Sequence, residues 1–73
     1  MTADQLREIK RELGLTNAGL AEALCMAEVS VKRMMTEAQP IAPSTVRAVV
    51  TLLYFHRRKR LKPSYDELLA EYV

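Results

Sequence analysis

The sequence predicts an all-α fold, in which five short helices form one small domain over residues 1–73. Only two glycines and three prolines interrupt the 73 residues, and β-branched residues nowhere alternate in period two for long. Apolar residues recur instead at the helical spacing of three and four positions. The single Cys cannot form an intrachain disulfide, and with the single His it cannot complete a four-ligand zinc site. We therefore expect a helical domain without metal or cofactor, stabilised by regular helix packing or by a partner chain.

Two helices are predicted in the first third of the chain. The first covers residues 3–13, and its apolar face consists of Leu6, Ile9 and Leu13. Gly14 ends this helix, because glycine readily adopts a positive φ. Thr16 is a good N-cap for a second helix of about two turns. The apolar stripe of that helix consists of Leu20, Ala21 and Leu24.

Three further helices are predicted at residues 28–36, at residues 43–59 and from Ser64 onward. The first follows a break over residues 25–27, and its inward face consists of Val31, Met34 and Met35. Pro43 suits the first turn of the second, which has two apolar stripes on nearly opposite sides: Val46, Val49, Val50 and Leu53, and then Ala48, Leu52 and Phe55. Pro63 ends the preceding segment, and Ser64 with Glu67 predicts a capping box for the last helix.

A helix-turn-helix pattern covers residues 13–33, whose sequence is LGLTNAGLAEALCMAEVSVKR, and PIAPST follows from Pro40. Over about residues 5–55 the chain resembles the helix-turn-helix repressors of the Cro/C1 type, also called XRE-like. The elements in register with that family are Gly14-Leu15-Thr16, Leu20-Ala21, Val31 and Pro43. The resemblance implies a five-helix, lambda-repressor-like DNA-binding domain whose motif places its second helix in the major groove. The compact size also resembles autorepressors of phages and mobile elements, including those encoded beside anti-CRISPR genes.

The turn of this motif departs from the family pattern. The family usually has Gly where Cys25 stands and a small hydroxyl residue where Ala27 stands. A left-handed Cys costs about 1 to 2 kcal/mol, so the turn either adopts another geometry or tolerates the strain. Ala27 gives up a capping side chain worth about 1 kcal/mol. The Glu and Gly that often follow in the family are Met35 and Glu37 here.

Helical geometry selects the side chains that would face DNA. With its apolar face inward, the helix over residues 28–36 has an outward face centred on Val29 and Arg33. The expected base-reading residues are Glu28 for cytosine, Val29 for a thymine methyl and Arg33 for guanine. The expected phosphate contacts are Ser30, Lys32 and Thr36, and the resemblance implies the same role for Asn17. Alternatively, Arg33 and Lys32 are ordinary solvated charges paired with Glu28 or Glu37.

These observations predict a transcriptional regulator, a repressor that binds an inverted repeat in double-stranded DNA as a homodimer. The last helix, within residues 60–73, supplies much of the candidate dimer interface, which consists of Leu52, Phe55, Tyr65, Leu68, Leu69 and Tyr72. The same residues could instead complete the core of the monomer. One rival is an antitoxin or adaptor that mainly binds a protein such as a toxin. Another is a nonspecific nucleic-acid binder that uses the basic run from Arg57 to Lys62, which could equally be a solvated helix C-terminus.

Other functional classes find no support in the sequence. The longest apolar run has five residues, at 23–27, whereas about 20 are needed to span a bilayer. The first 11 residues lack the apolar core of a signal peptide. We therefore expect a soluble, cytoplasmic protein with no membrane partner. Because no nucleophile–base pair, phosphate-binding glycine loop or paired carboxylate site occurs, we expect no enzymatic activity. Cys25 is expected to be a small buried hydrophobic residue.

Overall fold

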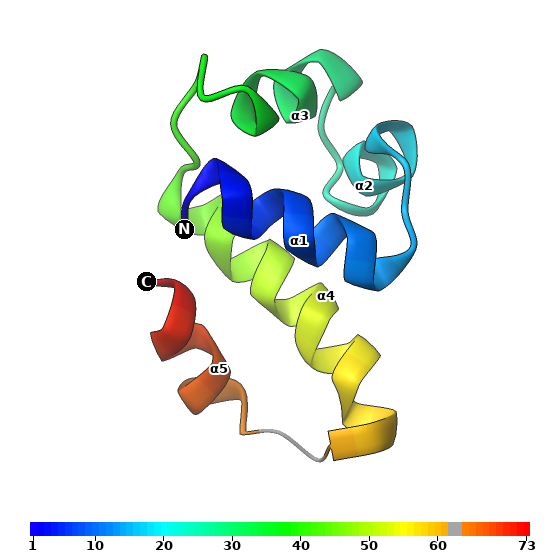
Figure 1. Ribbon diagram of the computed structural model, residues 1–73, viewed down its shortest axis with the longest axis vertical. Helices are drawn as coiled ribbons and strands as arrows, with labels where there is room; N and C mark the ends of the chain where they lie inside the picture. The colour runs from blue at the N-terminus through cyan, green and yellow to red at the C-terminus, as the bar shows by residue number, and fades with distance from the viewer. Residues whose placement is uncertain (62–63) are drawn as a thin grey trace. The chain divides into compact units, whose positions relative to one another are not determined.

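The computed structural model describes residues 1–61 and 64–73, which form five α-helices (Figure 1). The helices are α1 (Ala3–Leu13), α2 (Asn17–Ala23), α3 (Glu28–Met35), α4 (Pro43–Leu61) and α5 (Tyr65–Tyr72). No strand occurs in these described ranges, and the predicted all-α class is confirmed for them. Lys62 of the basic run and the predicted stop at Pro63 lie outside the described residues.

The chain divides into two compact units, Met1–Ile41 and Ala42–Val73. The first unit contains α1, α2 and α3, and the second contains α4 and α5. The single domain expected over residues 1–73 stays a prediction.

In the first unit, α1 begins and ends at the predicted residues. Thr2 and Gln5 form a capping box: the Thr2 hydroxyl accepts from the Gln5 backbone N–H at 3.1 Å, and the Gln5 side chain accepts from the Thr2 N–H at 2.8 Å. Helix α3 packs against both α1 and α2. The buried side chains of this unit are Ala3, Leu6, Ile9, Leu20, Ala21, Val31, Met34 and Met35. They include all three residues of the predicted inward face of α3.

In the second unit, α4 begins at Pro43 as predicted and extends two residues beyond the expected end at Lys59. Its first apolar stripe is buried, and consists of Val46, Val49, Val50 and Leu53. Helix α5 packs against α4. The predicted capping box at its start is wrong, because the Ser64 side chain makes no capping hydrogen bond. Only the Ser64 carbonyl takes part, accepting from the Leu68 N–H at 3.0 Å.

Candidate nucleic-acid interface

The connection between α2 and α3 is a tight turn built around a left-handed residue. Cys25 has φ 56°. Its N–H donates to the Glu22 carbonyl at 3.1 Å, and the Met26 N–H donates to the Ala21 carbonyl at 3.0 Å. This pair of bonds is a Schellman motif, which ends a helix and reverses the chain direction. The turn therefore tolerates the strain of a left-handed Cys.

The same turn explains why the expected burial of Cys25 is wrong. Its thiol is exposed, because the backbone conformation that ends α2 turns this side chain away from the core. Helix α3 then begins after Ala27, whose side chain makes no capping hydrogen bond, as its lack of a polar atom dictates. The Ser30 and Val31 N–H groups donate to the Ala27 carbonyl at 3.0 and 3.3 Å. The backbone alone thus sets the start of α3.

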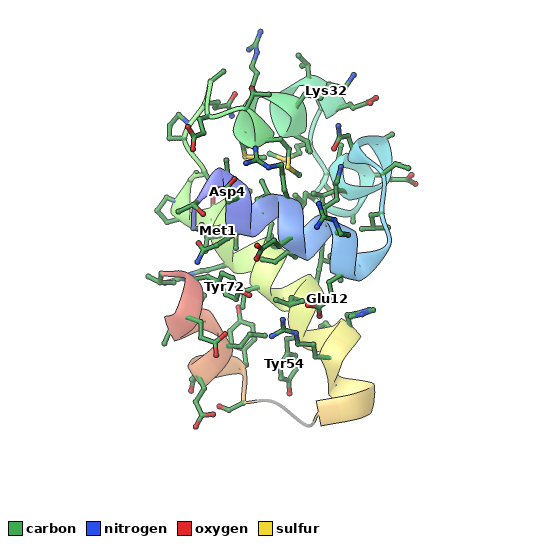
Figure 2. The ribbon with its side chains drawn as sticks, viewed as in Figure 1. Met1, Asp4, Glu12, Lys32, Tyr54 and Tyr72 are labelled. Carbon is green, nitrogen blue, oxygen red and sulfur yellow. The ribbon has the colours of Figure 1, made fainter. Side chains whose placement is uncertain are left out.

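The exposed face of α3 combines cations, an acid and an apolar side chain. Val29 is 52% exposed. Arg33, Lys32 and Glu28 are exposed on the same helix, and Ser30 is half-buried. Figure 2 shows Lys32 on the side of α3 that faces away from α1. The three predicted base-reading residues and two of the predicted phosphate contacts therefore lie on the accessible part of α3, which we call the α3 face: Glu28, Val29 and Arg33, with Ser30 and Lys32.

Two hydrogen-bonding groups of α3 are already engaged. The Lys32 ammonium lies 3.5 Å from the Glu28 carboxylate, one helical turn away, and these side chains are 60% and 48% exposed. The Thr36 hydroxyl donates to the Lys32 and Arg33 carbonyls at 3.1 and 3.2 Å. Within residues 1–61 and 64–73, Arg33 forms no ion pair. The Lys32–Glu28 pair thus agrees with the alternative interpretation, in which the cations of this helix pair with neighbouring acids. Arg33 has no such partner among the described residues.

A second polar cluster joins α1 to the start of α2. Thr16 caps α2 as predicted, since its hydroxyl accepts from the Gly19 N–H at 3.0 Å. The next residue, Asn17, accepts from the Lys10 ammonium at 2.9 Å through its side-chain oxygen. This bond leaves the Asn17 amide N–H groups and the remaining Lys10 N–H groups as donors. Lys10 was missed by sequence reasoning, because nothing in its local pattern distinguishes it from the other charges of α1.

Arg7 links α1 to the far end of α3. Its guanidinium donates to the Met35 carbonyl and pairs with Asp4 on its own helix. A cation at a helix C-terminus is favourable, because the last carbonyls are unsatisfied and carry partial negative charge. Arg7 therefore contacts the end of α3 from α1, and no sequence signal at residue 7 indicates a partner 28 positions away.

The turn that follows α3 has the same geometry as the turn that precedes it. Glu37 has φ 63°. Its N–H donates to the Met34 carbonyl at 3.4 Å, and the Ala38 N–H donates to the Arg33 carbonyl at 2.9 Å. This is again a Schellman motif, with Glu at the position where the resembled family often has Gly.

The predicted interface residues of the second unit differ in exposure. Leu68 is buried, Leu52, Tyr65, Leu69 and Tyr72 are half-buried, and Phe55 is 55% exposed. Phe55 packs edge-on against Tyr54 at 5.7 Å between ring centroids, and the Arg58 guanidinium lies 5.9 Å above its ring. Tyr54 also meets Tyr65 edge-on at 5.6 Å between ring centroids. Of the predicted interface residues, Phe55 therefore exposes the most surface.

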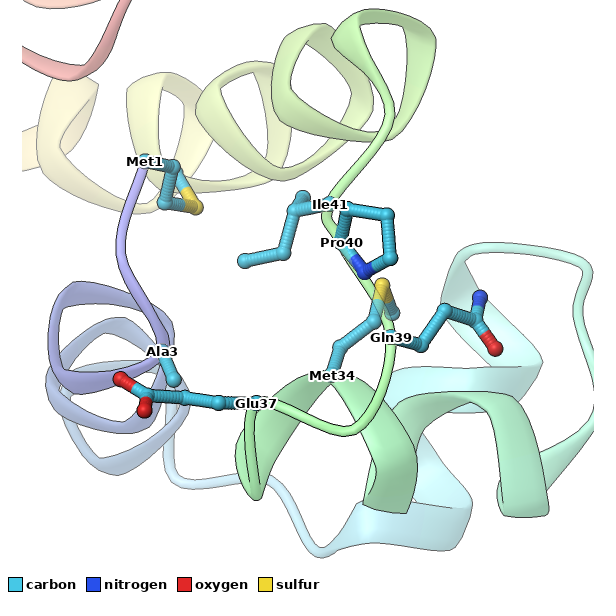
Figure 3. A pocket seen from close by; sticks show the side chains of 7 residues that line it. All are labelled: Met1, Ala3, Met34, Glu37, Gln39, Pro40 and Ile41. Atoms are coloured by element: carbon cyan, nitrogen blue, oxygen red, sulfur yellow. The ribbon is translucent and has the colours of Figure 1, made fainter.

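An open hollow of about 180 Å³ lies at the C-terminal end of α3, apart from the α3 face (Figure 3). It is lined by Met1, Ala3, Met34, Glu37, Gln39, Pro40 and Ile41. Across the described ranges, no His, Cys, Asp and Glu side chains gather in a metal-binding group. No described helix is both long and apolar enough to cross a bilayer.

Comparisons of the chain with protein-family models, curated proteins and solved structures find no match.

Proposed function

We propose that this chain is a sequence-specific DNA-binding transcriptional regulator of the Cro/C1 helix-turn-helix type, and that it acts as a repressor. The observation that carries the proposal is the exposure of Val29 beside Arg33 and Lys32 on α3. A half-exposed apolar side chain between cations is suited to the major groove, where thymine methyls lie next to acceptor groups and phosphates. The tight left-handed turn at Cys25, which places α3 directly after α2, supports the same proposal.

In this proposal α3 lies in the major groove. Arg33 donates two hydrogen bonds to guanine, Val29 packs on a thymine methyl, and Glu28 accepts from cytosine. Phosphate contacts come from Ser30 and Lys32 on α3 and from the Lys10–Asn17 cluster, whose remaining N–H groups are free to donate. Thr36 contributes less in this arrangement, because its hydroxyl already donates to carbonyls of α3.

The proposal includes a homodimer on an inverted repeat. Two copies would place their α3 helices about 34 Å apart on one face of the duplex. Phe55 is the anchor of the proposed contact, because it is 55% exposed and aromatic side chains are enriched at interfaces. Sedimentation of the wild type and of Phe55→Ser, with and without DNA, tests the dimer. A wild type that stays monomeric at micromolar concentration, both free and on its selected DNA, would exclude it.

The DNA assignment is tested by selection from a randomised duplex pool. A duplex of about 30 bp spans two half-sites. The enriched sequence is then titrated with the wild type, Arg33→Ala, Arg58→Ala and Arg47→Ala at one fixed salt concentration. Arg33→Ala should cost about 1 to 3 kcal/mol and relax the preference at one base position. Arg58→Ala tests the basic end of α4, and Arg47→Ala, which removes the same charge from an exposed position near the start of α4, serves as the matched control.

Two results would contradict the proposal. If Arg33→Ala weakens enriched and scrambled duplexes equally, α3 does not read bases. If Arg58→Ala causes the larger loss on both duplexes, the chain is a nonspecific binder that uses the basic end of α4.

The exposed Phe55 also favours a second candidate, an antitoxin or adaptor whose main partner is a protein. This candidate predicts that no sequence is enriched from the pool. It further predicts that Phe55→Ser abolishes binding to the protein encoded by a neighbouring toxin-like reading frame.

A further inference from the structure

An ion pair lies on the surface that the proposed function directs at DNA. The Glu28 carboxylate and the Lys32 ammonium are 3.5 Å apart, and both side chains remain about half exposed. That separation is longer than the 2.7 to 2.9 Å typical of a tight charge-assisted hydrogen bond. The pair is therefore loose and solvent-exposed, and such pairs contribute little to folding stability.

An acidic side chain on a DNA-facing surface has an electrostatic cost. A carboxylate only accepts hydrogen bonds, and the nearby phosphate and base oxygens are acceptors too. In the major groove, guanine presents O6 and N7 and thymine presents O4, all of which are acceptors. Cytosine presents the N4 amino donor without an adjacent acceptor of its own, whereas the N6 amino group of adenine lies beside N7. Of the four bases, cytosine is the best partner for Glu28.

We propose that the Glu28–Lys32 ion pair is a specificity filter, in which Glu28 holds Lys32 away from phosphates until a cytosine amino group replaces it. This inference rests on the proposed function. On random DNA the carboxylate keeps the ammonium, so one phosphate contact is lost and nonspecific binding is weak. At a site with cytosine in reach, the carboxylate accepts from N4 and the released ammonium binds phosphate. Because the pair is loose, the exchange requires little free energy.

Glu28→Gln tests the filter. Glutamine cannot hold an ammonium by charge, and its amide both donates and accepts, so it accommodates any base. Gaining one phosphate contact should steepen the slope of log K against log salt by about 0.9. Affinity for random DNA at low salt should rise about twofold to fivefold, because an exposed ion pair worth at most about 1 kcal/mol withholds no more than that. On the selected duplex, the preference for cytosine at one position should fall about tenfold. Fluorescence anisotropy on random-sequence and selected duplexes over a salt series measures all three quantities.

Glu22→Gln is the matched control. It removes the same charge from an exposed position on α2, outside the α3 face and outside any ion pair of the described residues. Its salt slope and its base preference should equal those of the wild type. Thermal unfolding of both variants separates the filter from a structural role, because a helix-stabilising Glu28 would change the melting temperature without changing the slope.

A double-mutant cycle with Lys32→Gln isolates the role of the pair. In the Lys32→Gln background, Glu28→Gln should change affinity for random DNA less than twofold, since no ammonium remains to be released. An equal rise in both backgrounds would mean that Glu28 repels DNA directly, and would overturn the filter.

The filter and the proposed function fail in different ways. If Arg33→Ala loses base preference while Glu28→Gln matches the wild type in affinity, slope and cytosine preference, only the filter is wrong. If Arg33→Ala shows no base-dependent loss, the proposed function is wrong and the filter falls with it.

Discussion

Replacing Cys25 by Gly should stabilise the protein. Cys25 has φ 56°, a conformation that costs an L-residue about 1 to 2 kcal/mol. Glycine avoids this cost, but it gives up about 0.5 to 1 kcal/mol through the greater freedom of the unfolded chain. The thiol is exposed, so its removal sacrifices no buried contact. The net gain in the free energy of unfolding is about 0.5 to 1 kcal/mol, or about 2 to 8 °C in melting temperature for a chain of this size.

Two further variants make the measurement specific to backbone conformation. Gly14 has φ 70°, and a Cβ added there would meet no atom within 4 Å. Gly14→Ala should therefore destabilise by a similar amount, because it introduces the conformational cost without a steric clash. Cys25→Ala should leave stability unchanged within about 0.5 kcal/mol, since alanine carries the same cost as cysteine.

Urea unfolding followed by helical circular dichroism measures all three variants. The slope with denaturant should stay constant, because none of the changes alters the surface exposed on unfolding. If Cys25→Gly fails to stabilise while Gly14→Ala destabilises, residue 25 is not left-handed in solution. The turn between α2 and α3 would then have another geometry, and the proposed helix-turn-helix would lose one observation that supports it.

Three further changes test the remaining contacts. Glu37→Gly should also stabilise by about 0.5 to 1 kcal/mol in the same unfolding assay, because Glu37 has φ 63°, and a loss would show that its side chain is needed. Arg7→Ala should destabilise by about 1 to 2 kcal/mol, and Arg7→Lys by less, since only the guanidinium can reach both the Met35 carbonyl and Asp4; equal losses would contradict this. Lys10→Ala should lower the salt slope of DNA binding by about 0.9 without changing base preference, and a changed preference would refute its phosphate role.

Helical periodicity predicts the elements and the inward faces of this chain. The bounds of α1, the start of α4 and the buried face of α3 were all predictable, because apolar spacing directly determines which side of a helix is buried. Two helix ends were also predictable from single residues: Gly14 is left-handed as expected, and Thr16 caps α2. These features depend on residues a few positions apart, which is the range over which sequence patterns carry information.

The contacts between elements were not predictable in the same way. Arg7 reaches the Met35 carbonyl and Lys10 reaches Asn17 because of how α1 crosses the other helices, and periodicity does not specify a crossing. The burial predicted for Cys25 is wrong for a different reason. Residue type favours burial of a free cysteine, whereas the left-handed backbone at that position turns the side chain outward. Ser64 had the right residue type for a cap, but its hydroxyl does not take part.

The backbone conformation, rather than capping side chains, determines where α3 begins and ends. Ala27 offers no capping group, and left-handed residues precede and follow the helix, at Cys25 and Glu37. Cys25 and Glu37, which are left-handed without being glycine, thus flank α3, whereas the left-handed residue at the end of α1 is Gly14. Strain of this kind persists only where the surrounding packing fixes the conformation, and it concentrates at functional elements. Because its two turns and Arg7 fix α3, the exposed side chains of the α3 face need no structural role and remain available for a ligand.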